Sequence, residues 1–299
     1  MDRFQLINIF VAVAEEESFS AAARRLQISA PAVTRGVLAL EERLGVKLLT
    51  RTTRIVRVTE AGARYLEDAR RIMLELEEAD EAAAGNNATP RGLLAVTAPV
   101  LFGKLFVMPI VAEYQSIYEQ TTVSALFVDR VVNFVDEGMD VGIRIGPLPD
   151  SLLRATRVGH VRRVVCAAPD YLKKHGIPQK PDDLKEHRIV ASTGLSPISE
   201  WAFVERGERI TVQVQPRIQV NTNDGALEAA RHGFGLTRLL SYQVAALLDS
   251  GQLKTVLSNY EGPNLPVHVI HREGRHGSAK VRSFVDLVVD RLRADKTLN

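Results

Sequence analysis

Residues 19–49, FSAAARRLQISAPAVTRGVLALEERLGVKLL, decide the fold of the N-terminal part of the chain. Ser20 is expected to cap a short helix of small residues, and Ser29 to cap a second helix with Pro31 in its first turn. Gly45 ends this second helix, whose apolar residues recur at helical spacing: Val33, Val37, Leu40 and Leu44. Two helices joined by a tight turn predict a helix-turn-helix, in which the leading end of the second helix meets base edges in the major groove.

A basic segment follows these helices. Residues 47–59 are rich in threonine, isoleucine and valine, which predicts a small β-hairpin, or wing, whose arginines lie along phosphates. Residues 18–64 carry nine basic and three acidic side chains, a net charge of +6, whereas residues 67–81 carry two and seven, a net charge of −5. The positive charge is thus concentrated where a DNA backbone would lie. The alternative is a solvated basic face on a small helical domain. The residues expected to contact DNA are Ser20, Arg24, Ser29, Ala30, Pro31, Thr34, Arg35, Arg51, Arg54 and Arg57.

A long linker helix is expected over residues 60–84, with Thr59 as its N-terminal cap. Its 25 residues would span about 37 Å. The narrow apolar stripe along one side suits pairing with a second copy of the chain, and packing against the C-terminal part of the same chain is the alternative. The stripe consists of Leu66, Ala69, Met73, Leu76 and Ala83. Turn formers and a proline make residues 85–92 a hinge.

Strands and helices alternate beyond the hinge. Strands are expected at 93–97, 121–127 and 141–145 and helices at 101–114 and 131–137, which predicts βαβ units around a mostly parallel sheet. The expected architecture is an all-α winged helix-turn-helix at 1–59, the linker helix at 60–84 and an α/β domain at 93–299. This domain is divided into two lobes, one at about 93–162 plus 264–299 and the other at 163–263.

A ligand site is expected at the ends of these strands, because ligands of open α/β sheets bind beyond the carboxyl ends of strands and near helix N-termini. The candidates are Pro99, Val100, Phe102, Asp129, Arg130, Arg144, Gly146, Asn221, Asn223 and Asp224. Asparagine and aspartate are also ordinary helix caps, so a capping role alone stays open. Phe102 and Trp201 are expected in core packing, with a pocket wall as the alternative. We expect Arg130 or Arg144 to hold an anionic ligand; the alternative is structural pairing of Arg130 with Asp129 and of Arg144 with Asp140.

Catalytic motifs do not emerge from the sequence, which contains no Gly-x-Ser-x-Gly, no Walker loop and no His-Glu-x-x-His. His268 and His271 are three residues apart in an expected strand and so lie on opposite faces, which is poor metal geometry. Cys166 lies in the apolar run 164–168, which favours a buried, inert thiol over a nucleophile. We therefore expect no enzyme, no cofactor and no metal site.

The cellular location is expected to be the cytoplasm. The chain has a single cysteine, residues 1–20 do not have the pattern of a signal peptide, and no apolar run approaches the roughly 18 residues needed to cross a bilayer. The lack of an export signal also disfavours an exported solute-binding protein.

The whole chain resembles the LysR-type transcriptional regulators. The resemblance is strongest over 19–26, 29–35 and 40–49, continues through 51–52 and 58–62, and includes the strand end Asp140-Val141-Gly142-Ile143-Arg144-Ile145-Gly146. It implies a homodimer or homotetramer built through paired linker helices, an interrupted palindromic operator and a periplasmic-binding-protein-like effector domain. The partners expected on this basis are double-stranded operator DNA, a small-molecule effector, further copies of the chain and RNA polymerase.

Two positions depart from the family pattern. Family members often have glutamine where this chain has Ala30, and alanine cannot form the bidentate contact with adenine that glutamine makes. They also often have a longer polar residue at the position of Gly36, where glycine costs about 1 kcal/mol of helix stability relative to alanine. This glycine either permits close approach to the DNA backbone or is simply tolerated.

Overall fold

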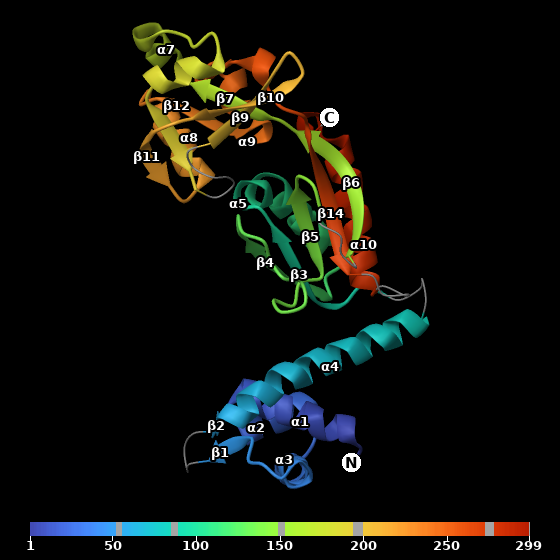
Figure 1. Ribbon diagram of the computed structural model, residues 1–299. Coiled ribbons are helices and arrows are strands. Elements are labelled where there is room, and N and C mark those ends of the chain that lie inside the picture. The colour runs from blue at the N-terminus through green and yellow to red at the C-terminus, as the bar shows by residue number, and fades with distance from the viewer. Residues whose placement is uncertain (52–55, 85–88, 149–152, 194–199, 273–277, 299) are drawn as a thin grey trace. The chain divides into compact units, whose positions relative to one another are not determined.

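The computed structural model describes residues 1–51, 56–84, 89–148, 153–193, 200–272 and 278–298. The chain folds into two compact units, an N-terminal unit of Met1–Ala88 and a C-terminal unit of Thr89–Asn299 (Figure 1). Each unit has its own apolar core.

The N-terminal unit is a three-helix cluster followed by a hairpin and a long helix. Its elements are α1 (Arg3–Glu16), α2 (Phe19–Leu26), α3 (Ala30–Leu44), β1 (Leu49–Arg51), β2 (Val56–Val58) and α4 (Glu60–Ala84). The two short strands pair antiparallel, with Thr50 opposite Arg57. Phe10, Val33 and Leu40 are buried at the centre of the shared core. The predicted helix-turn-helix, wing and linker helix are all present.

The helix ends of this unit follow local capping rules. The Ser29 hydroxyl oxygen accepts a hydrogen bond from the Ala32 backbone nitrogen at 3.3 Å, and Gly45 ends α3 with φ of 67°. Thr59 caps α4, because its Oγ1 accepts from the Gly62 nitrogen at 2.9 Å. These caps confirm the predictions. The predicted cap at Ser20 is wrong: Ser18 has the extended backbone of a cap and its Oγ accepts from Ala21, which leaves Ser20 inside the first turn.

The apolar stripe of α4 has a use that the sequence did not predict. Ala69 is buried in the core of the N-terminal unit, and Leu66 and Met73 are packed against that core. The first half of α4 therefore belongs to the helix-turn-helix core. Ile72, by contrast, keeps 41% of its surface exposed and is not part of this packing.

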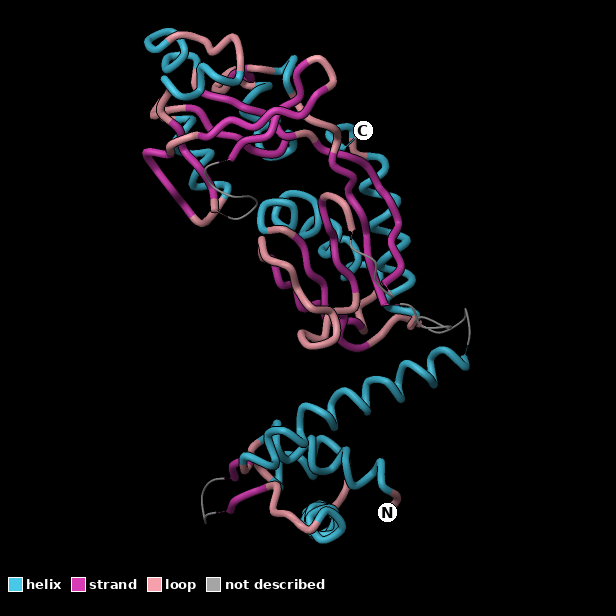
Figure 2. Tube along the Cα trace, viewed as in Figure 1, coloured by secondary structure: helices cyan, strands magenta, loops and turns pink. Residues whose placement is uncertain are grey.

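The C-terminal unit contains two lobes, each built on a five-stranded sheet (Figure 2). The first-lobe sheet has the order β4-β3-β5-β14-β6. Its strands are β3 (Gly92–Ala98), β4 (Thr121–Phe127), β5 (Val141–Ile145), β6 (Leu153–Val161) and β14 (Leu265–Arg272). Its helices are α5 (Val100–Phe102), the π-helical turn Gly103–Val107, α6 (Met108–Ile117) and α10 (Ala279–Ala294).

The second-lobe sheet has the order β11-β8-β12-β7-β13, and a separate hairpin of β9 and β10 packs with it. The strands are β7 (Arg163–Ala167), β8 (Ile189–Ser192), β9 (Glu200–Glu205), β10 (Glu208–Gln213), β11 (Pro216–Val220), β12 (Leu236–Leu240) and β13 (Lys254–Val256). The helices are α7 (Pro169–His175), α8 (Asn223–Arg231) and α9 (Ser241–Asp249), with a 3-10 turn at Pro181–Glu186.

Both sheets are mixed rather than mostly parallel, which corrects the expectation. β3, β4 and β5 run parallel, but β14 runs antiparallel to both β5 and β6. The reason is topological, since β6 leaves the first lobe and β14 returns to it, so the two must run in opposite directions. In the second lobe β7, which follows that crossover, runs antiparallel to β12 and β13.

The helix predicted at 131–137 is not formed. Residues 134–138 make turns instead. The Oδ1 atom of Asn133 accepts a hydrogen bond from the Val135 nitrogen at 3.0 Å, and Gly138 has a positive φ of 60°. An asparagine side chain that binds the backbone two residues on competes with helix formation, which explains the difference.

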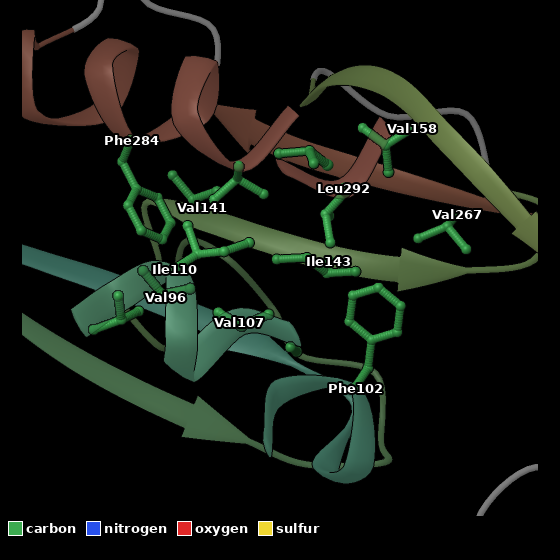
Figure 3. Close-up of a cluster of buried hydrophobic side chains, with 14 of the residues drawn as sticks. Val96, Phe102, Val107, Ile110, Val141, Ile143, Val158, Val267, Phe284 and Leu292 are labelled. Carbon is green, nitrogen blue, oxygen red and sulfur yellow. The ribbon is translucent and has the colours of Figure 1, made fainter. Parts of the chain in front are cut away.

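The core of the first lobe lies between its sheet and helices α6 and α10. Phe102, Ile143 and Phe284 are fully buried there, and Figure 3 shows them converging from α5, β5 and α10.

Residues 100–117 are long and apolar enough to cross a membrane by hydropathy, contrary to the sequence expectation. Their side chains Phe102, Ile110 and Tyr114 nevertheless belong to this core, which identifies the segment as a core helix.

The second lobe also contributes to the first-lobe core. Tyr242, at the start of α9, lies with its ring 5.3 Å from that of Phe102 and 5.7 Å from that of Phe106. This aromatic contact joins the two lobes beside the ends of β3 and β12.

Candidate DNA-binding surface and ligand pocket

The leading end of α3 faces solvent. Ser29, Ala30, Pro31 and Arg35 are exposed and Thr34 is half-buried, while Val33 and Val37 on the opposite side of the helix are buried. Ser20 and Arg24 are exposed on α2. The polar candidates are therefore available to a partner, as a recognition helix requires.

The arginines of this unit fall into two groups. Arg25 is ion-paired with Glu15 at 2.7 Å, and Glu15 also pairs with Arg70 at 3.0 Å. Arg24, Arg35 and Arg57 are exposed, and within the described residues none of them forms an ion pair. Their charges are free to meet phosphates. Arg54 lies outside the described residues, as does the side chain of Arg51.

The wing is held to α3 by a buried carboxylate that the sequence reasoning missed. Glu41 is only 6% exposed, and its Oε1 accepts hydrogen bonds from the backbone nitrogens of Leu48 and Leu49 at 3.0 and 3.1 Å. Its Oε2 pairs with Lys47 at 2.6 Å. Burial opposes ionisation of Glu41, but these hydrogen bonds outweigh burial and hold its pKa below the usual value. The signal that could have predicted this role is a glutamate one helical turn before the glycine that ends the helix and directly ahead of the hairpin.

Two glycines position the helices beneath this surface. A Cβ on Gly36 would lie 2.7 Å from the Ile9 Cδ1 atom, so this glycine allows α3 to pack closely on α1. Gly36 is buried and faces α1, which replaces both sequence explanations for it. A Cβ on Gly62 would lie 2.0 Å from the Leu48 carbonyl oxygen, so α4 can start against the wing only with glycine there.

The C-terminal unit contains a pocket between its lobes with a volume of about 170 Å³. Five of the sequence candidates line it: Pro99, Asp129, Arg130, Arg144 and Asn223. Gly146, Asn221 and Asp224 are not part of this lining as the described residues define it. Val100 contributes its backbone nitrogen to Asp129, and Phe102 and Trp201 are buried core residues rather than pocket walls.

The pocket has further walls beyond the candidates given above; of these, Val128 follows the expected strand 121–127, and the strand-end rule covers it. The additional lining residues are Val128, Val131, Ile145, Arg163, Leu240, Tyr242, Gln243 and Leu265. Tyr242 follows the carboxyl end of β12, so the same strand-end rule would have found it had that strand been assigned. Arg163 offers no such signal, because it begins a strand rather than ending one.

Asp129 links the helix N-termini of the two lobes. Its Oδ1 accepts from the Val100 nitrogen at 3.0 Å, and its Oδ2 lies 3.4 Å from the Nδ2 of Asn223. Burial and the nearby charge of Asp224 raise the pKa of Asp129, although the hydrogen bond from Val100 opposes them. This carboxylate is a structural acceptor, not a partner of the pocket arginines.

Both structural pairings proposed for the pocket arginines are wrong. Arg130 pairs with Glu137 through two contacts of 2.7 and 2.6 Å, not with Asp129. Asp140 accepts from the Ala95 nitrogen at 2.8 Å, not from Arg144. The charge of Arg130 is thus already met by Glu137, whereas the charge of Arg144 is not met by the acid that was expected to pair with it.

Arg144 has an incompletely satisfied guanidinium. Its Nη1 donates to the Ile143 carbonyl at 2.9 Å, and its Cζ lies 5.9 Å from the ring centre of Phe134. Its Nη2 is buried without a hydrogen-bond acceptor, and no carboxylate in the described part of the chain pairs with it. Burial lowers the pKa of Arg144, and the charge of Glu137 partly opposes this. A bound anion would supply the missing acceptor.

Cys166 is fully buried, and burial raises its pKa to about 12. The thiolate is therefore not available as a nucleophile, which confirms the expectation of an inert thiol.

A helix-turn-helix with exposed arginines that form no ion pair within the described residues, in a chain that also carries a two-lobed unit with a pocket of apolar and charged residues, defines a ligand-responsive transcriptional regulator. Residues 4–63 match the family described as "Bacterial regulatory helix-turn-helix protein, lysR family", and residues 87–293 match "LysR substrate binding domain". The chain belongs to the LysR family of transcriptional regulators.

Similar proteins agree with this assignment. The chain is 34% identical to an HTH-type transcriptional regulator of Xanthomonas campestris pv. campestris, over 96% of this chain and 85% of that protein. It is 31% identical to the HTH-type transcriptional activator AaeR of Escherichia coli, over 97% and 94% of the two chains. The structure of CrgA, a LysR-type regulator from Neisseria meningitidis, matches with a TM-score of 0.63 and 29% identity over 96% and 98% of the two chains. These are regulators, a non-enzymatic class, and LysR-type regulators bind operator DNA and small-molecule effectors and form oligomers.

Proposed function

We propose that this regulator senses a small anionic effector through Arg144 and binds its operator through the leading end of α3. The observation that carries the effector proposal is the state of Arg144. It lines a pocket between the lobes, yet its Nη2 is buried without an acceptor. A buried donor of a charged group left unsatisfied is unfavourable, so a ligand oxygen that accepts a hydrogen bond from it would remove part of that cost.

The DNA contact surface in this proposal consists of the exposed residues of α2 and α3 and the wing. Arg35 and Thr34 read base edges, while Arg24 and Arg57 bind phosphates, because their charges have no partner within the described residues. The exposed backbone of the first turn of α3, at Ser29 and Ala30, lies against the DNA backbone.

Self-association in this proposal uses α4 of two chains, in a dimer or a tetramer. Its support is the exposure of Ile72, an apolar residue outside the helix-turn-helix core. The regulator acts in the cytoplasm, with RNA polymerase as a further partner; the buried reduced thiol of Cys166 fits that compartment.

The effector proposal is tested by titrating small carboxylates by calorimetry against the full chain and its Arg144→Ala variant. Binding to the wild type that is lost in Arg144→Ala is expected, with Arg130→Ala as the control because Arg130 is already paired with Glu137. Unchanged binding in Arg144→Ala would exclude that arginine as the anion site. DNA footprinting tests the second part, with protection of an interrupted palindrome as the expected result.

A further inference from the structure

A second arginine without an acid partner lines the same pocket as Arg144. Arg163 is the first residue of β7, directly after the crossover from the first lobe to the second. In the part of the chain that the structure describes, it forms no ion pair; its neighbour Arg162 does, with Glu261 at 2.6 Å. The pocket therefore has one unpaired arginine on a first-lobe strand and another on a second-lobe strand.

The surroundings of Arg163 add positive charge. Leu240 is opposite Arg163, and Arg238 is opposite Val165, in the antiparallel pair β12–β7. Arg238 and Arg163 are therefore diagonal neighbours on one face of the second-lobe sheet. The guanidinium of Arg238 lies 5.0 Å from the ring centre of Trp201 and donates to the Ala202 carbonyl at 3.2 Å.

Within the described residues, Arg163, Arg209 and Arg238 form no ion pair with an acidic side chain. Burial and the charge of Arg163 lower the pKa of Arg238 to about 10, and Arg209 adds a further like charge beside Arg163. Arg238 is half-buried, whereas Arg163 and Arg209 are exposed, so water screens part of their repulsion and a bound anion would reduce it further. Arg209 and Arg238 thus add positive potential beside Arg163, which is the member of this group that lines the pocket.

The remainder of the pocket is consistent with a short ligand that is charged at both ends. Its one acidic lining residue, Asp129, already binds Val100 and Asn223. Pro99, Ile145, Leu240 and Leu265 give the lining an apolar part. The volume of about 170 Å³ lies below the roughly 300 Å³ at which pockets for drug-sized ligands begin, so the ligand is a small metabolite.

We propose that the effector is a small aliphatic dicarboxylate, with one carboxylate held by Arg144 in the first lobe and the other by Arg163 in the second. This inference rests on the proposed anionic-effector site and specifies the chemical class of its ligand. Such a ligand binds to both lobes at once and fixes their relative position, which a monocarboxylate held by Arg144 alone does not do.

The test compares dicarboxylates with their monoamides, which keep the length and remove one charge. Malonate, succinate, glutarate and adipate, and the monoamide of each, are titrated by calorimetry into the full-length protein. At least one diacid is expected to bind about tenfold or more tightly than its monoamide, the scale of one charge-assisted hydrogen bond. Arg163→Gln is expected to reduce diacid affinity to the level of the monoamide, and Arg163→Lys to retain part of the preference.

Two further variants separate this inference from the proposal beneath it. Arg144→Gln is expected to weaken both ligand types, and Arg162→Gln, the ion-paired neighbour, to change neither. Equal binding of diacid and monoamide to the wild type, or a diacid preference that survives in Arg163→Gln, would overturn the dicarboxylate inference and leave an anionic effector at Arg144 in place. Absence of binding by every diacid and monoamide would overturn both. Circular dichroism melting curves establish that each variant is folded.

Discussion

Within the described residues, the two units of this regulator both carry arginines without acid partners, but in opposite surroundings. Arg35 in the N-terminal unit is exposed on a helix, whereas Arg144 in the C-terminal unit is half-buried in a pocket. Each has a paired counterpart nearby, Arg25 with Glu15 and Arg130 with Glu137. Pairing therefore distinguishes the arginines whose charge is met by an acid within the chain from those whose charge is not.

The surroundings of each unpaired arginine favour a different kind of anion. An exposed charge is screened by salt and water, so it contributes little unless many such contacts act on one polyanion. A half-buried charge acts in a medium of lower dielectric constant, where one or two contacts can bind a small molecule. In the proposed function, the same type of side chain thus binds DNA in one unit and a small molecule in the other.

Salt gives the largest expected difference between the two sites. A protein that neutralises about six to ten phosphates loses on the order of 10³–10⁵ in DNA affinity between 50 and 200 mM salt. Effector affinity is expected to fall by less than about fivefold over this range, because buried pairs are screened less. Fluorescence anisotropy with operator DNA and calorimetry with the effector measure the two slopes. Similar salt dependences of DNA affinity and effector affinity would contradict the proposed difference between the two sites.

Arg35→Ala is expected to cost about 1–3 kcal/mol of discrimination between operator and random DNA, because the proposal places this side chain against a base edge. The matched control is Arg25→Ala, which removes an equally basic side chain already paired with Glu15. Binding of both variants to both DNAs is measured by anisotropy. Equal weakening of Arg35→Ala on the two DNAs would reassign Arg35 to a phosphate contact.

Acid is expected to loosen the wing through Glu41. Because the pKa of Glu41 is lower in the folded protein than the ordinary 4.5, its contribution to stability is complete above that value. This contribution, about 1–2 kcal/mol for hydrogen bonds to a carboxylate, is lost as the pH falls through the lowered pKa. The protection of the backbone amides of segment 44–51 against hydrogen exchange, measured relative to their intrinsic exchange rates at each pH, should therefore fall below pH 4.5.

The control for this acid effect is Glu41→Gln. In this variant, the same segment should be less protected than in the wild type already at pH 7, and its protection should not fall further in acid. A wild-type segment whose protection does not change between pH 6 and pH 3 would contradict the role given to Glu41.

The smallest effect is expected for Arg130→Gln. Arg130 lines the pocket, but its charge is already met by Glu137, so effector affinity should change by less than about threefold, the scale of an exposed ion pair. A loss as large as that of Arg144→Ala, measured by the same calorimetry, would show that pairing does not separate the two arginines.

The sequence alone determined the features that depend on neighbouring residues. Ser29, Gly45 and Thr59 set helix ends through contacts within a few residues, so their roles could be read directly. The wrong prediction at Ser20 also concerns neighbouring residues, because Ser18, two residues earlier, is the cap of α2. The strand-end rule found Asp129, Arg144 and Asn223 because each follows or ends a strand, or begins a helix.

Only the tertiary structure decided which distant groups meet. Gly36 owes its role to Ile9 on another helix, and Arg163 reaches the pocket because a crossover strand ends there. Arg130 pairs with Glu137 rather than with its neighbour Asp129, whose carboxylate is hydrogen-bonded to Val100 and Asn223 at the N-termini of helices from both lobes. Charges and close packing act through space rather than along the chain, so the partners of these residues follow from the fold and not from their order in the sequence.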